Sequence, residues 1–135
     1  MPMHEGGGFL VGRLHEDATA LERRGWLVGF FMPEGDPRKV SGFEVKFHFV
    51  EPGERTHELK VDGAVDFNIL LDGTAVGVFD GEEKELAARL DDPDSWIYAV
   101  VSPGVVNAFP RHARTRLIML CVKSPSVPGL KQVVE

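Results

Sequence analysis

The sequence predicts an all-β fold, a small antiparallel β-barrel with one short helix near its N-terminus. Turn dipeptides separate short apolar segments at regular intervals, and two of those segments alternate between apolar and polar residues. The 135 residues include 15 Gly and 9 Pro, which favours many turns over long helices. Asp-Gly suits tight hairpins because both positions tolerate a positive φ. The turn dipeptides are Pro52-Gly53, Asp62-Gly63, Asp72-Gly73, Asp80-Gly81 and Pro103-Gly104.

Length and charge limit the class of protein. The chain is long enough for one core and short for two, so we expect a flexible N-terminal tail over residues 1–8 and one barrel domain over residues 9–135. The formal charge of −6 disfavours nucleic acid and anionic membrane surfaces as partners. The sequence contains no apolar run of membrane-spanning length and no recognisable secretion signal, so we expect a cytoplasmic protein.

The first elements are a strand, a helix and a second strand. Residues 9–11 are apolar and predict an edge strand. Good helix formers fill residues 14–24, and Gly25 follows where a helix C-cap is expected. Residues 26–32 are almost all apolar and predict a buried strand, which the polar loop 33–39 closes.

The clearest alternation lies in residues 43–50 and predicts a strand with one dry face. Residues 65–71 alternate in the same way, and we expect a hairpin at Asp72-Gly73 to connect them to the next strand. Further strands are predicted over residues 74–79, 96–101 and 114–123. Residues 82–90 contain helix formers and suit a helical turn or a strand, of which the barrel context favours the strand. In residues 43–50, the apolar face carries Phe43, Val45, Phe47 and Phe49, and the other face carries Glu44, Lys46 and His48.

The last part of the chain contains the single cysteine and two prolines. Cys121 cannot form an internal disulfide, and its apolar surroundings predict a small buried hydrophobe. Pro125 and Pro128 exclude a central strand after residue 124. We therefore expect the C-terminal residues to lie across the surface or on a neighbouring subunit.

Two spans resemble the motifs of the cupin superfamily, small jelly-roll barrels. EPGERTHELKVDGAVDFNILLDG, residues 51–73, resembles the first motif, in which a Pro-Gly turn precedes a His-x-His pair and then an acidic residue seven positions before a Gly. SPGVVNAF, residues 102–109, resembles the second motif, in which Pro and Gly precede a third His. The resemblance covers about half of the chain and implies a double-stranded β-helix.

The metal-binding positions of that family are degenerate in this chain. The resemblance places the closing glycine at Gly73, the acidic ligand at Asp66 and the third histidine at Asn107. The nearest histidine to the His-x-His positions, His57, is displaced by at least two residues. One carboxylate and one amide bind borderline metals poorly, so we expect no bound metal and no cofactor. The His-x-His positions hold Leu59 and Val61, or Lys60 and Asp62.

Three functional interpretations remain open. The first is a small-molecule-binding or non-catalytic module with a sugar-like or other ligand in the barrel mouth. The second, implied by the resemblance, is a metal-independent sugar or sugar-nucleotide epimerase or isomerase with His48, Asp66 and Tyr98 as acid–base groups. The third is a metal-dependent cupin enzyme with a displaced site at His57 and Asp66, with His48 as a further ligand. The expected pocket residues are His57, Asp66, Asn68, Trp96, Tyr98 and Asn107.

Each functional interpretation competes with one in which the same residues have only a structural role. Asp66 and Asn68 would then only satisfy backbone groups near a turn, His48 would lie on a solvent-exposed face, and side chains would fill the barrel. The basic cluster at residues 111–116 is interpreted as a solvated loop rather than an anion site.

The sequence also predicts a self-associating surface. If Asp66 faces inward, the intervening residues Phe67, Ile69 and Leu71 form an apolar outer surface. A second copy of the chain is its simplest cover, so we expect a homodimer. The aromatic residues Trp26, Phe30 and Phe31 are interpreted as core or subunit interface.

Overall fold

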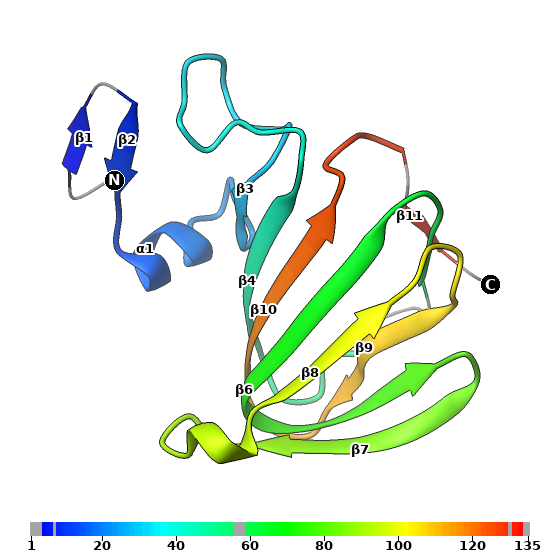
Figure 1. The fold of residues 1–135 in the computed structure, drawn as a ribbon. Helices are drawn as coiled ribbons and strands as arrows, with labels where there is room; N and C mark the ends of the chain where they lie inside the picture. Colours follow the sequence, from blue (N-terminus) through cyan, green and yellow to red (C-terminus); the bar gives the residue numbers. More distant parts are fainter. Residues whose placement is uncertain (1–3, 7, 56–58, 130, 134–135) are drawn as a thin grey trace.

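The computed structural model shows antiparallel strands that curl around a common interior (Figure 1). It describes residues 4–6, 8–55, 59–129 and 131–133. The strands are β1 (His4–Gly6), β2 (Phe9–Val11), β3 (Trp26–Val28), β4 (Glu44–Val50), β5 (Leu59–Val61), β6 (Val65–Phe79), β7 (Glu82–Ala88), β8 (Ile97–Val101), β9 (Asn107–Ala113), β10 (Leu117–Ser124) and β11 (Lys131–Val133). The helical elements are α1 (Leu14–Thr19) and the 3-10 turn η1 (Pro93–Ser95).

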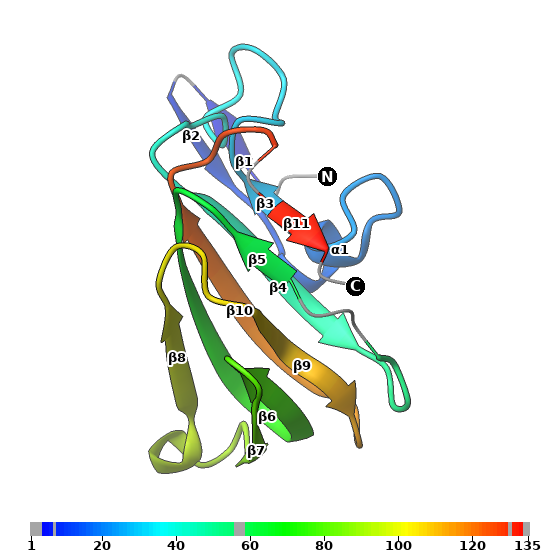
Figure 2. The same cartoon turned by 90° about the vertical axis from the view of Figure 1, so that its right-hand side faces the viewer.

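Strand β6 belongs to two sheets. Its first half pairs with β10 and β8, and its second half pairs with β7 and β9. The first sheet therefore has the order β3-β4-β10-β6-β8, and the second has the order β11-β5-β9-β6-β7. Figure 2 views the molecule from the side of β5 and β11. The interior lies between these two sheets.

The predicted hairpin at Asp72-Gly73 is wrong, because β6 continues through both residues. Gly73 has a φ of 106°, and a Cβ there would contact the carbonyl oxygen of Arg116 and the side chain of Leu117. Only glycine accepts this conformation and this close approach without strain. The dipeptide therefore bends the strand from one sheet into the other instead of reversing it.

The helix and the strand that follows it are shorter than predicted. Helix α1 ends at Thr19, and Ala18 is its only buried residue, so few apolar contacts support further turns. Strand β3 ends at Val28 rather than at residue 32. The backbone at Gly29 passes so close to Ser126 that an added Cβ would lie 2.9 Å from its Oγ.

Most of the other predicted strands are confirmed. Strand β7 settles the segment 82–90 as a strand, and β2, β4 and β8 lie where the sequence predicts them. Strand β10 begins at Leu117 instead of residue 114, because the preceding residues form a turn. Strand β1 pairs with β2, which places residues 4–6 of the predicted tail in a hairpin. The flexibility of residues 1–8 stays a prediction.

The core occupies one end of the interior. Its largest fully buried members include Leu70, Leu117 and Met119, and Phe109 packs against them. The polar end of the interior, described below, lies further along the same strands. Within the described ranges, no helix is both long enough and apolar enough to cross a membrane.

Candidate ligand cavity

Strand register determines which side chains face the interior of the first sheet. Directly paired residues in antiparallel strands lie on the same face. Strand β10 is central here, because it pairs with β4 on one side and with β6 on the other. Three rows result: Glu44, Lys123 and Asp66; then Lys46, Cys121 and Asn68; then His48, Met119 and Leu70.

The rows change from polar to apolar along the strands. Met119 and Leu70, in the third row, are 0% and 1% exposed and belong to the core. The first two rows carry charged and amide groups beside a cavity of about 450 Å³. Strand β9 and the loop after β4 supply most of the other lining residues, and β3 supplies Trp26. They include Glu54, Arg55, Asn107 and Phe109.

Four of the predicted site residues line this cavity. Asp66 and Asn68 come from β6, Asn107 from β9 and His48 from β4. Asn68 and Asn107 are each 7% exposed, so their amides are largely removed from bulk water. The sequence therefore located much of the polar lining. His57 lies outside the described residues.

Trp96 and Tyr98 lie outside the cavity that they were expected to close. Tyr98 pairs with Ile69, and both face away from the interior, which leaves Tyr98 68% exposed. Trp96 is 41% exposed, and its indole Nε1 donates a hydrogen bond of 2.9 Å to the carbonyl oxygen of Arg89. The register of β8 decides the placement of Tyr98, because a shift of one residue exchanges the faces.

The polar face of β4 is the inner face. The interpretation of His48 as part of a solvent-exposed face is therefore corrected. Phe47 lies on the opposite face and is 8% exposed, and the neighbouring Phe49 packs against His15 of α1, with ring centroids 4.7 Å apart. Cys121, expected to be a buried hydrophobe, is half-buried and lines the cavity.

The cavity wall also contains a buried ion pair that local sequence patterns do not predict. Lys123 Nζ lies 2.6 Å from Glu44 Oε1, and the two side chains are 11% and 3% exposed. The other carboxylate oxygen of Glu44 accepts a 2.8 Å hydrogen bond from Ser126 Oγ. Alternation in the sequence already places Glu44 on the same strand face as His48. Only the pairing of β4 with β10 identifies Lys123 as the partner of Glu44.

The structure does not assemble the predicted acid–base trio. Tyr98 faces outward, as described above. His48 and Asp66 lie in rows four residues apart along β10, roughly 13 Å at about 3.3 Å per residue, and two strands apart. Side chains so far apart do not converge on one reacting atom.

The described residues do not fit the transition-metal site that cupins carry. Asp66 and Asn107 both line the cavity, but an amide is neutral, and Lys123 is paired directly beside Asp66. An ammonium group at that place repels a divalent cation. In the described part of the chain, no three His, Cys, Asp or Glu side chains converge as metal ligands.

The basic residues near the end of β9 do not gather into one site. Arg114 Nη2 lies 2.6 Å from Glu85 Oε1 at the surface. The guanidinium of Arg116 lies over the ring of Phe49, 5.5 Å from its centroid. Arg114 and Arg116 are exposed and follow β9, in keeping with the solvated loop. Arg111 and His112 belong to β9 itself, so the loop interpretation is wrong for them.

Known proteins resemble this chain in structure. No family model matches the sequence, and no curated protein matches it. An uncharacterised protein with a double-stranded β-helix domain from Klebsiella pneumoniae is 18% identical, with 71% of this chain and 77% of that chain covered and a TM-score of 0.58. Pac13, a nucleoside dehydratase, is 15% identical, with 71% of each chain covered and a TM-score of 0.55.

A salicylate 1,2-dioxygenase from Pseudaminobacter salicylatoxidans is 18% identical, with 63% of this chain covered and a TM-score of 0.50. This chain spans only 22% of the dioxygenase. Likeness at such low identity establishes the fold and leaves the activity to the site. The chain has the cupin fold, an antiparallel jelly-roll barrel of the double-stranded β-helix type.

Proposed function

We propose that the protein binds a small, neutral, hydroxyl-rich molecule in the polar cavity, without a bound metal. The observation that carries this proposal is the change from an apolar floor to rows of polar side chains around a cavity of about 450 Å³. Ligand sites in proteins have this size and this mixture of apolar walls and few oriented polar groups.

The charges of the lining favour a neutral ligand. Among the described lining residues, the cations are Lys46, Arg55 and Lys123, and the carboxylates are Glu44, Glu54 and Asp66. Hydroxyl groups both donate and accept hydrogen bonds, so a sugar-like molecule can satisfy both kinds of group. A ligand of either sign would instead leave one set of charges uncompensated.

Binding is favoured over acid–base catalysis because His48 and Asp66 do not converge and Tyr98 lies outside. Pac13 supports the proposal by analogy only, since its name places a nucleoside dehydratase on this fold.

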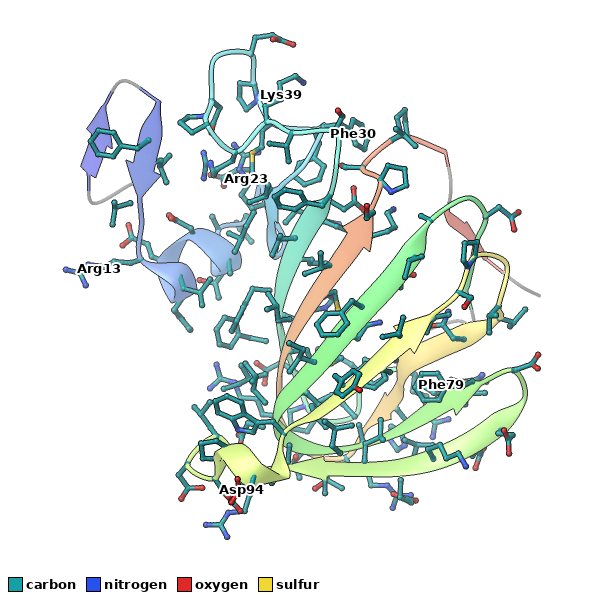
Figure 3. The ribbon with its side chains drawn as sticks, in the orientation of Figure 1. Arg13, Arg23, Phe30, Lys39, Phe79 and Asp94 are labelled. Atoms are coloured by element: carbon teal, nitrogen blue, oxygen red, sulfur yellow. The ribbon has the colours of Figure 1, made fainter. Side chains whose placement is uncertain are left out.

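A thermal-unfolding screen of neutral sugars and polyols tests the proposal. A ligand that binds only the native state raises the unfolding midpoint. Asn68→Ala removes a buried amide from the middle row and should weaken binding about tenfold. Asp94→Asn is the control, because Asp94 is exposed at the far end of the molecule (Figure 3). Failure of every compound to stabilise the protein would contradict the proposal, as would equal affinity in the Asn68 variant.

The single cysteine gives an independent readout. Cys121 lines the cavity, so a ligand bound there should slow its alkylation by iodoacetamide. Alkylation at an unchanged rate under saturating ligand would place the ligand elsewhere.

Elemental analysis tests the metal-free part of the proposal. Protein grown with Fe, Mn, Ni and Zn should carry none of them stoichiometrically. A stoichiometric metal that is lost in His57→Ala would instead support the displaced cupin site.

A further inference from the structure

A second cavity adjoins the polar one at the end of β3. Its volume is also about 450 Å³. Its walls include the rings of Trp26, Phe30 and Phe31 and the apolar residues Val127 and Pro128. Figure 3 shows Arg23, another lining residue, and Phe30 at the same end of the sheet. The three aromatic residues predicted to be core or interface therefore line an open space.

Three side chains line both cavities. Trp26, Glu44 and Lys123 form this shared wall. The Glu44–Lys123 ion pair is buried, and Ser126 ties the carboxylate to the turn after β3 by accepting a 3.0 Å hydrogen bond from the Phe30 backbone N–H. The two cavities are thus neighbouring chambers on either side of one wall, and a ligand that occupies both must pass beside these side chains.

The second chamber differs from the first in chemistry. Trp26 and Phe31 meet edge to face with centroids 5.5 Å apart, and Phe31 and Phe30 do so at 5.6 Å. All three residues are only half-buried, so ring surface remains available in the chamber. Aromatic walls of this kind bind planar rings through stacked or edge-to-face contacts.

Trp26 connects the two kinds of surface. The Lys46 ammonium, which lines only the polar cavity, lies 5.0 Å from the centroid of the Trp26 ring. Phe31, which lines only the aromatic cavity, packs against the same indole. The change from polar to aromatic lining therefore occurs across one side chain.

We propose that the two cavities bind one ligand together, with its hydroxylated part in the polar chamber and a planar aromatic or heteroaromatic ring in the aromatic chamber. The inference rests on the proposed function and extends it by naming the ligand class. Neutral aryl glycosides and nucleosides have this composition.

The test compares ring-bearing ligands with their ring-free counterparts. Phenyl β-D-glucopyranoside is compared with methyl β-D-glucopyranoside, and adenosine is compared with methyl β-D-ribofuranoside. In a Trp96→Phe background, Trp26 is the only tryptophan, so its fluorescence reports the aromatic chamber. At least one ring-bearing probe should bind about tenfold more tightly than its methyl counterpart and change the Trp26 emission.

Variants assign the gain to the aromatic chamber. Phe30→Ala should remove the advantage of the ring and leave binding of the methyl glycosides unchanged. Phe30→Leu, which keeps most of the volume, should remove the aromatic part of the advantage and guards against a folding defect. Phe43→Ala is the matched control, because Phe43 is 42% exposed and is not among the lining residues of either cavity.

The outcomes separate this inference from the proposed function. Equal affinity for ring-bearing and methyl compounds would overturn the two-chamber inference and leave the polar site standing. Equal weakening of both classes by Phe30→Ala would do the same. If no probe binds at millimolar concentration while other sugars or polyols do, only the ligand class is wrong. If no sugar or polyol binds at all, both proposals fail.

Discussion

At the residue scale, Gly73 sets the bend that allows β6 to serve both sheets. The strand must turn there while its backbone passes the carbonyl oxygen of Arg116. A side chain at this point would push β6 away from the turn before β10.

We therefore expect Gly73→Ala to lower the free energy of unfolding by at least about 2 kcal/mol, because strain at positive φ adds to the clash. Urea denaturation measures the change. Gly53→Ala is the control, since Gly53 also has a positive φ, 86°, but has no atom within 4 Å of its added Cβ. It should cost only about 1 kcal/mol. Equal costs at the two sites would show that the close approach is unimportant.

Also at the residue scale, Asp36 should make the stability of the protein depend on pH. Hydrogen bonds from the Arg38 side chain, the largest cause, hold the pKa of Asp36 below its usual value of 3.8, although burial opposes the shift. A lowered pKa in the folded state stabilises the protein above the unfolded pKa, and this contribution is lost as the pH falls through the folded value.

Asp36→Asn should therefore lose about 1 kcal/mol of stability at neutral pH, since the pair is only partly exposed. The difference from the parent protein should shrink below about pH 4 and vanish at lower pH. Denaturation from neutral pH to about pH 2 measures it. A difference that stays constant over this range would contradict the assignment.

At the element scale, the Glu44–Lys123 ion pair joins β4 to β10 within the wall of the two cavities. Burial makes each charge dependent on the other, because neither is well solvated alone. The pair Arg114–Glu85 has the same N–O distance of 2.6 Å, but its side chains are 51% and 66% exposed. The two pairs differ mainly in burial.

Lys123→Met should destabilise the protein by about 3 kcal/mol, because it leaves the Glu44 carboxylate buried without its partner. Adding Glu44→Gln should recover most of the loss, since the amide oxygen still accepts from Ser126. Glu85→Gln at the exposed pair should change stability by less than about 0.5 kcal/mol. Denaturant titration of the parent protein, Lys123→Met, Glu44→Gln and the double variant gives the coupling energy, and additive losses at Glu44 and Lys123 would contradict the pairing.

At the scale of the whole molecule, the outer face of the first sheet is apolar. Phe67 and Tyr98 meet there with ring centroids 5.8 Å apart, and Tyr98 and Val100 are 68% and 57% exposed. This is the surface that the sequence analysis assigned to a second copy. The homodimer stays a prediction.

Sedimentation should show a dimer that Val100→Glu converts to a monomer, because a charge would be buried in an apolar interface. Leu21→Glu is the control: Leu21 is 89% exposed in the turn between α1 and β3, at the opposite edge of the first sheet from β8, and its change should not affect association. A parent protein that remains monomeric at high concentration would contradict the prediction.

Local sequence patterns predicted the positions of the strands better than they predicted how the strands are connected. Alternation located β4 and the first half of β6, and it placed Asp66 and Asn68 on one face. The same local evidence failed at Asp72-Gly73, because a glycine with positive φ serves a hairpin or a bend equally well.

The sequence by itself determined the all-β class, the resemblance to cupins and a group of polar residues that includes His48, Asp66, Asn68 and Asn107. The class and the alternating faces of β4 and β6 follow from turn propensity and period-two alternation, which act over a few neighbouring residues. The place of Asn107 is implied by the resemblance to the second cupin motif. Only the tertiary structure decided that the polar face of β4 points inward, that Tyr98 points outward and that Lys123 lies between Glu44 and Asp66. Those outcomes depend on pairing between strands distant in sequence, and a register shift of one residue would reverse them.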